Sequence, residues 1–359
     1  MEIENNAQRS VVPDVCRGIA IFLVVWGHIL QRGLSGISDI NENVIFKIIY
    51  SFHMPLFILI SGFFFCGSQK RKELKGLVFD RVRLLLRILF IWNTVCYVCK
   101  YILAFVQGTE SSFFVKGWID ELLRGYWFLW AILFFTIIVG IVCKVFARRW
   151  WLLGCVLLAP VMLISPCRWV MLSIYPFYLA GFFYSVRTDE GKPCFTKIKY
   201  VTIALFVIGT VFYLSHSAVE NSEIKGLLDV GICMLRKEVG VTELMVQILR
   251  VCLYYFLGFV GSIATIVVVE LMVKKNPSAK IVNQISELGK YSLQIYILQR
   301  VIIEILLGEV CSELGRLTGS VPAFTYVYSF LISCVCVVIV FCIAKYGIRG
   351  KLRNVLFGR

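Results

Sequence analysis

The sequence predicts an all-α membrane protein, a polytopic bundle of about ten transmembrane helices. Of its 359 residues, 59% are hydrophobic and only 16% are charged, a balance that soluble domains do not reach. A spanning helix needs about 20 apolar residues, so about ten such helices fit with short loops between them. We therefore expect one integral-membrane domain over residues 1–359 and no separate soluble domain.

Ten apolar runs, bounded by polar or basic residues, are the expected spans. In order, they are Cys16–Leu30, Val44–Phe65, Leu84–Val106, Tyr126–Phe146, Trp150–Ile164, Trp169–Val186, Tyr200–Leu214, Leu244–Val273, Tyr291–Leu307 and Tyr326–Ala344. The fifth and seventh are the shortest. Two longer connecting segments, Gln107–Gly125 and Ser215–Glu243, are expected on the outer side, and long ordered loops over a membrane core usually cover or shape a site.

The distribution of Lys and Arg orients the chain, because short cytoplasmic loops collect these residues. The loops after the even-numbered spans and the tail carry Lys70, Arg71, Lys72, Lys75, Arg81, Arg83, Lys144, Arg148, Arg149, Arg187, Lys192, Lys197, Lys199, Lys274, Lys275, Lys280, Lys345, Arg349, Lys351, Arg353 and Arg359. The longer odd-numbered gaps hold fewer, chiefly Arg32, Lys116, Arg124, Lys225, Arg236, Lys237 and Arg316. This alternation predicts that both termini are cytoplasmic.

The net charge of +15 is explained by this topology and by contact with anionic membrane lipid, and we expect no nucleic-acid partner. Most of the fourteen cysteines fall inside the expected spans, where a free thiol behaves as a small hydrophobic group. We expect no metal site, because carboxylate or imidazole ligands do not accompany them. Pairing among Cys167, Cys233 and Cys311 and the oligomeric state stay open.

The first span carries two ionisable residues on one face. Arg17 and His28 are eleven positions apart, which is about three full turns of α-helix and about 16 Å along the axis. Asp14 is three residues before Arg17 and close enough to pair with it. Arg17 therefore marks the cytoplasmic interface, and His28 lies past the middle of the bilayer.

The second span brings another histidine to a similar depth. His53 follows the expected start at Val44 by nine residues, about 14 Å, and His28 lies about 18 Å from the inner end of its own span. Pro55 frees a backbone carbonyl next to His53, which membrane helices tolerate beside a partner or a water-lined cavity. Each histidine could merely hydrogen-bond a neighbouring helix. Ionisable residues inside spans are functional candidates by default, and the matching depth of two favours function.

Three arginines begin the third span: Arg81, Arg83 and Arg87. Arg83 and Arg87 are one turn apart and share a face. A cluster of guanidinium groups at the inner mouth suits a phosphate-bearing ligand, because arginine binds phosphate with a planar fork of donors. Interfacial anchoring to lipid phosphates is the alternative for this cluster taken alone.

These motifs together resemble the membrane-bound acyltransferase 3 family, many of whose members O-acetylate bacterial glycans. The family's opening pattern is matched by Asp14, Arg17-Gly18 and Gly27-His28, and its second pattern by Phe52-His53-Met-Pro55-Leu56-Phe57 and Ser61-Gly62-Phe63. Trp127-Phe128-Leu129 matches at the fourth span, and Gly289-Lys-Tyr-Ser292-Leu-Gln-Ile-Tyr296 looks like the family's Gly-x-x-Ser-x-x-x-Tyr segment. The run from Tyr126 to Trp130 looks closest to the fucose acetylase-like branch. The chain departs from the family at Gln299-Arg300, where a histidine often stands, and in the spacing of the third-span arginines.

The resemblance implies a membrane-bound acyltransferase of the bacterial cell membrane. It would take an acyl-CoA donor, with acetyl-CoA expected, and a glycan or lipid-linked saccharide acceptor. We expect Arg17, Arg81, Arg83 and Arg87 to hold the CoA phosphates, and Asp14, Trp127 and Tyr296 to contribute to substrate binding. Which of the third-span arginines carries the role stays open.

The two histidines are the expected catalytic residues. His28 is the expected general base, because imidazole has a pKa near the working pH, and His53 would orient the acceptor or stabilise the oxyanion. The reverse assignment and a covalent acyl-imidazole both stay open. A transporter that uses His28 and His53 as a proton relay is the alternative from another class. A sensor or scaffold that lost its chemistry, suggested by Gln299, is a third.

Overall fold

The computed structural model describes residues 11–35, 37–69, 74–108, 114–188, 199–216, 229–234, 236, 240–317 and 321–358. Helices dominate these residues, and no strand is present among them. Within the same ranges, seven helices are long and apolar enough to cross a membrane. They are α1 (Val12–Gly33), α2 (Val44–Gln69), α3 (Leu74–Val106), α5 (Trp127–Val145), α7 (Arg168–Thr188), α10 (Val241–Lys275) and the continuous run of α14 (Val321–Ala323), η5 (Phe324–Tyr328), α15 (Ser329–Cys342) and η6 (Ile343–Gly347). The all-α polytopic class is thus confirmed.

Three of the ten expected spans differ from a single long helix. The fifth is divided into α6 (Trp151–Leu158) and a 3₁₀ segment, η3 (Ala159–Ile164), which begins at a proline-containing turn. The seventh forms α8 (Lys199–His216), whose apolar part, Tyr200–Leu214, is shorter than the others. The ninth is divided into α12 (Ser292–Gln299) and a π-helix, η4 (Arg300–Leu306). The seven long helices are thus supplemented by three irregular or shorter segments.

Helices also occupy stretches that were expected to be loops. The segment Gln107–Gly125 contains an amphipathic helix, α4 (Val115–Arg124), which packs against α3. Further short helices are α11 (Lys280–Lys290), α13 (Gly308–Leu317) and α16 (Gly350–Phe357). Most of the expected outer segment Ser215–Glu243 lies outside the described residues, as do the loop residues Lys70–Lys72 and Lys192–Lys197.

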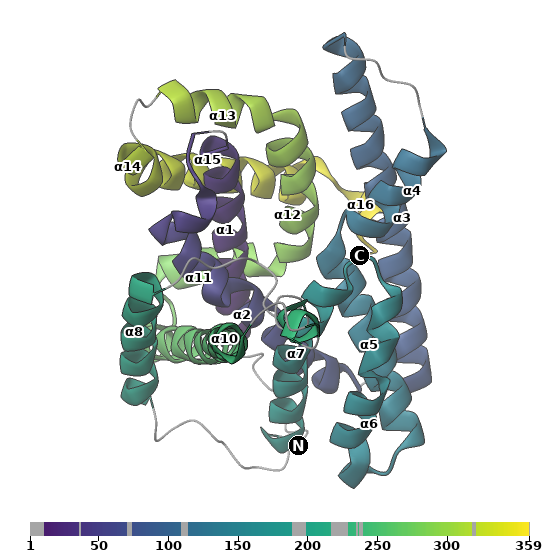
Figure 1. The fold of residues 1–359 in the computed structure, drawn as a ribbon. Helices are drawn as coiled ribbons and strands as arrows, with labels where there is room; N and C mark the ends of the chain where they lie inside the picture. Colours follow the sequence, from purple (N-terminus) through teal and green to yellow (C-terminus); the bar gives the residue numbers. More distant parts are fainter. Residues whose placement is uncertain are drawn as a thin grey trace.

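The bundle is built around α1 and α2. Helix α2 packs against α7, α10 and α1, and α1 also contacts α11, α15, α13 and α12. Helix α3 runs along one edge of the molecule, with α4, α5 and α16 beside it (Figure 1). Segments from the beginning and the end of the sequence therefore enclose the same interior.

Two glycines of the sequence motifs allow close contacts that fix α1. A Cβ at Gly18 would collide with the backbone of Ile285 in α11. The close approach of α11 to α1 therefore requires a glycine at position 18. A Cβ at Gly27 would lie 2.7 Å from the ring of Tyr50 in α2. Because Gly27 precedes His28, this contact holds α1 and α2 together beside the histidine.

We predict the orientation of the chain from the basic loops. A cysteine-accessibility map in intact cells is expected to label residues 70–75 and 192–199 only from the inside, and 111–116 and 221–225 from the outside. Labelling of either basic loop from outside would overturn the ten-span topology. Substituted cysteines within α5, which carries Lys144 only in its last turn, serve as membrane-embedded controls that neither reagent should reach.

Candidate active site

Both histidines line one cavity of about 390 Å³. Its walls come from α1, α2, α7, α8, α10, α12, η4 and the start of α5, and its lining includes His28, Gln31, Ser51, His53, Trp127, Tyr213, Arg250, Tyr254, Tyr296, Gln299, Arg300 and Glu304. Apart from Tyr296, these residues lie in the halves of their helices that the charge pattern assigns to the outer side. The depth estimated from α-helical rise thus agrees with a common location for His28 and His53.

A carboxylate that the sequence analysis missed lies against His28. Nε2 of His28 is 3.6 Å from Oε1 of Glu304, and both side chains are largely buried, at 25% and 18% exposed. Gln299 donates a hydrogen bond from Nε2 to the same Oε1 at 3.0 Å. The hydrogen bonds of a π-helix join residues five apart, so η4 brings residues 299 and 304 together. In a regular α-helix they would point about 140° apart.

His53 is held in one orientation by its own helix. Its Nδ1 is 2.7 Å from the carbonyl oxygen of Ile49, and the neutral ring therefore donates Nδ1–H to that oxygen. The ring is buried and lies 4.7 Å from the ring of Tyr50, measured between centroids. With Nδ1 protonated, Nε2 is left as a hydrogen-bond acceptor.

The other predicted substrate-binding aromatics also line the cavity. Trp127 is the first residue of α5. Tyr296 lies in α12, one turn before Arg300, the first residue of η4. Ring centroids of Tyr296 are 5.3 Å from Phe128 and 5.8 Å from Tyr126. The aromatic run at the start of α5 therefore packs directly against the segment that carries Tyr296.

The first-span arginine lies at the opposite end of α1 from the cavity. Arg17 lies 3.6 Å from the carboxylate of Asp14, which is 2% exposed, and its guanidinium carbon is 3.9 Å from the ring centroid of Phe64. Neither Asp14 nor Arg17 lines the histidine cavity. If Asp14 binds a substrate, it therefore does so at the N-terminal end of α1, away from the histidine cavity.

The three third-span arginines face different surroundings. Arg81 lies over the ring of Phe65 at 5.3 Å, Arg83 is exposed, and Arg87 donates from Nη2 to the carbonyl oxygen of Asn354 in the C-terminal helix α16 at 3.0 Å. The aromatic pair of Trp92 and Phe357 completes this docking of α16 on α3. Arg87 thus makes a structural contact, and the role of the three in donor binding stays a prediction.

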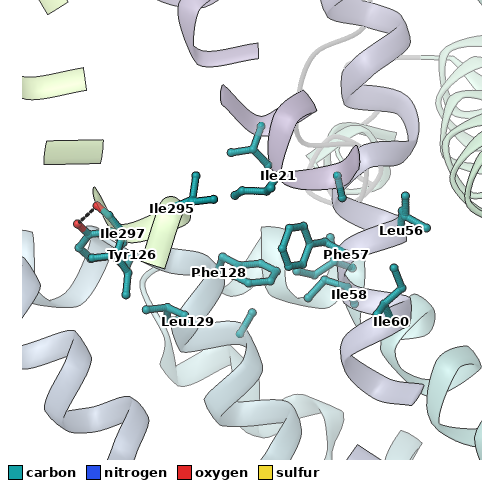
Figure 2. Close-up of a cluster of buried hydrophobic side chains, with 14 of the residues drawn as sticks. Ile21, Leu56, Phe57, Ile58, Ile60, Tyr126, Phe128, Leu129, Ile295 and Ile297 are labelled. Carbon is teal, nitrogen blue, oxygen red and sulfur yellow. Dashed lines mark hydrogen bonds between the residues drawn. The ribbon is translucent and has the colours of Figure 1, made fainter. Parts of the chain in front are cut away.

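Buried apolar side chains lie between the arginine end and the histidine end. Figure 2 shows Ile21, Phe57, Phe128 and Ile295 gathered in this layer. Ile21 is between Arg17 and His28 along α1, and the rings of Phe57 and Phe128 meet edge to face at 5.3 Å between centroids. The side chains that these residues place between the two ends of α1 are therefore apolar.

The cavity adjoins a second one, of about 450 Å³, and Glu304 lines both. Two charged residues besides Glu304 line the first cavity but were not predicted from the spacing of residues along the sequence: Arg250 and Arg300. Arg300 was visible as a departure from the family pattern and received no role. In the described part of the chain, no three His, Cys, Asp or Glu side chains gather as metal ligands would.

The structure is a helical membrane bundle with two histidines on one internal cavity, and α1 carries both His28 and, toward its other end, Arg17. These features define a class of membrane-embedded enzymes or carriers. A sequence-family model described as an acyltransferase domain matches residues 11–346. The chain therefore belongs to the acyltransferase 3 family, as the motifs predicted.

Two curated relatives are similar over part of the chain. The nodulation protein NolL of Mesorhizobium japonicum is 29% identical over 210 residues, which cover 57% of this chain and 55% of the relative. The nodulation protein NolL of Sinorhizobium fredii is 32% identical over 206 residues, covering 55% and 54%. The chain thus spans about half the length of the curated relatives it matches. No solved structure gives a significant match.

Proposed function

We propose that the protein transfers an acyl group from acyl-CoA, bound at the cytoplasmic side, to a hydroxyl of a glycan or lipid-linked saccharide in the bacterial cell membrane. The observation that carries this proposal is the pair of histidines on one cavity, with Glu304 3.6 Å from His28. Acetyl-CoA is the proposed donor. The family match supports the reaction type, whereas donor and acceptor are our inference.

His28 is the proposed general base. Its imidazole takes the hydroxyl proton as the oxygen bonds to the thioester carbonyl carbon, and the C–S bond then breaks, with the thiolate taking a proton back from the imidazolium. Glu304 would stabilise the positive charge that forms on the ring. The carboxylate in turn is held by Gln299, so the residue that replaces the family's histidine keeps a position in the site.

His53 is the proposed orienting residue for the acceptor. A neutral ring with Nδ1–H on Ile49 accepts a hydrogen bond at Nε2, which suits a hydroxyl group. Stabilising an oxyanion needs a donor, so this tautomer favours the orienting role over the oxyanion role.

The proposal is tested with detergent-purified protein and radiolabelled acetyl-CoA. We expect release of CoA thiol with transfer of label to a saccharide, or slow hydrolysis when water replaces the acceptor. A carrier using the two histidines as a proton relay would instead move its ligand in proteoliposomes without consuming acetyl-CoA. Flux without CoA release would overturn the proposal.

Arg17→Ala is expected to weaken CoA binding by about 10- to 100-fold, because one charge-assisted contact to phosphate contributes about 1.5–3 kcal/mol. Isothermal titration of CoA into purified protein measures this. Arg168→Ala is the matched control, since Arg168 also lies near an aromatic ring, that of Trp169, but at the other end of the bundle. A purely structural Arg17 would lower the melting temperature and leave the affinity of the folded fraction unchanged.

A further inference from the structure

The second cavity, of about 450 Å³, has no part in the proposed chemistry apart from Glu304, which it shares with the first. It lies at the predicted outer end of the bundle, and its walls come from the C-terminal ends of α1 and α3, from η4 and from α13. Ligand pockets in proteins measure about 300–1,000 Å³, so each of the two cavities is large enough to hold a small molecule. The site therefore offers room beyond the cavity that contains the histidines.

The two cavities meet at Glu304, and two elements pass from one into the other. Along η4, Arg300 lines the first cavity and Ile305 lines the second. Along α1, Gln31 lines the first cavity and Arg32 the second. The second cavity therefore continues the first toward the C-terminal end of α1.

The distance from the proposed base to the second cavity suits a neighbouring sugar. Arg32 follows His28 by four residues, so the two side chains share one face of α1 and lie about 6 Å apart along its axis. This separation is comparable to the length of one pyranose ring. When a hydroxyl of one sugar is at His28, the next sugar of the same glycan can therefore reach Arg32.

Several polar side chains around the second cavity are already engaged with one another. The carboxylate of Glu121 lies 2.8 Å from Nζ of Lys100 and 2.7 Å from Nη2 of Arg300. Lys100 lines the second cavity and Arg300 the first, so one carboxylate of α4 holds a residue of each. Gln107 donates a hydrogen bond to Glu309 at 2.6 Å. These contacts fix the walls of the second cavity.

Three polar side chains of the second cavity remain available to a ligand: Arg32, Ser35 and Ser312. They make no hydrogen bond or ion pair within the part of the chain that the structure describes. A guanidinium group donates hydrogen bonds, and a hydroxyl group both donates and accepts them. Leu103 and Leu306 add apolar surface to the same cavity, against which the C–H groups of a sugar ring can pack.

The charges of the second cavity favour an uncharged ligand. Arg32 and Lys100 are balanced there by Glu304 and Glu309, so an anionic or cationic ligand would meet like charge as well as opposite charge. The hydroxyl groups of a sugar donate and accept hydrogen bonds without this repulsion. We infer that the second cavity is a subsite for the sugar next to the one that is acylated, so that the preferred acceptor is an uncharged oligosaccharide. This inference rests on the proposed acyltransferase function and extends it to the length of the acceptor.

The test compares acceptors of increasing length. Purified protein receives acetyl-CoA and the methyl glycosides of glucose, galactose, mannose and N-acetylglucosamine, together with the neutral di- and trisaccharides that end in the same sugars and a disaccharide whose second sugar is glucuronic acid. The release of CoA is measured. For the best series of acceptors, we expect KM to be about tenfold lower for the disaccharide than for the monosaccharide, which is about 1.4 kcal/mol. Mass spectrometry of the product should place the ester on the terminal sugar.

Ser312→Trp fills the second cavity and should reduce the ratio of the two KM values from about ten to about one, because the contacts of the second sugar are lost. Glu313→Trp is the matched control, since it places the same indole on the next residue of α13. Glu313 lines neither cavity, and its side chain is 60% exposed, so the ratio should stay as in the wild type. Arg32→Gln should lower the ratio about threefold or more, and it decides the matter if Ser312→Trp does not fold.

Four results would overturn the subsite. They are equal KM values for all lengths of acceptor, an unchanged ratio in folded Ser312→Trp (or in Arg32→Gln where Ser312→Trp does not fold), a preference for glucuronic acid as the second sugar, and consumption of acetyl-CoA with water as the sole acceptor. An absence of CoA release with every acceptor and with water would instead refute the proposed function.

Discussion

His28→Gln is expected to reduce acyl transfer by about 10²- to 10⁴-fold, the usual cost of losing a positioned general base, while the protein still binds acyl-CoA. Glutamine can keep a hydrogen bond to Glu304 but cannot take a proton at neutral pH. Arg17, the proposed donor-binding residue, is about 16 Å away along α1, so donor affinity should be unchanged. Single-turnover transfer per folded molecule and CoA titration measure the two quantities separately.

His53→Gln is the matched comparison, because both histidines line the same cavity. A helix–helix hydrogen bond in a membrane contributes only about 0.6–2 kcal/mol, so a structural His28 would give a less stable protein whose folded fraction reacts normally. Near-normal transfer by His28→Gln together with an inactive His53→Gln would move the role of base to His53. His28→Ala should be as inactive as His28→Gln, since neither side chain accepts the proton.

Sequence reasoning located the histidines because a regular α-helix converts residue number into depth. Both α1 and α2 are regular where it mattered, and His28 and His53 accordingly line one cavity. The position of Glu304 could not be predicted in this way, because the prediction assumes regular α-helical geometry. It lies in a π-helix, and α-helical spacing would turn it away from Gln299.

Contacts between distant segments were the other part that sequence could not supply. Arg87 has the spacing of a ligand for phosphate, yet it contacts α16, which is more than 260 residues further along the chain. Asn93 and Arg300 come together only because α3 and η4 are packed against each other. Local periodicity describes one face of one helix and carries no information about which face of another helix it meets.

Glu304→Gln is expected to lower kcat by about 10- to 100-fold, or about 1.4–2.7 kcal/mol in the activation free energy, with little change in donor affinity. Two unit charges about 4 Å apart interact by about 4 kcal/mol at an effective dielectric constant of 20, and the partial exposure of both side chains reduces this. The measurement is kcat against the affinity for CoA, with the melting temperature recorded for each variant.

Glu309→Gln is the matched control for this carboxylate. Glu309 lines the second cavity with Glu304 and accepts a hydrogen bond from Gln107 at 2.6 Å, but it does not contact His28. Its substitution should leave kcat near the wild-type value. Because glutamine at position 304 keeps the size of the side chain and can still accept from Gln299, a fall in kcat without loss of stability reports the missing charge beside the imidazole. Wild-type kcat in Glu304→Gln would instead mean that His28 takes its proton without the help of this carboxylate.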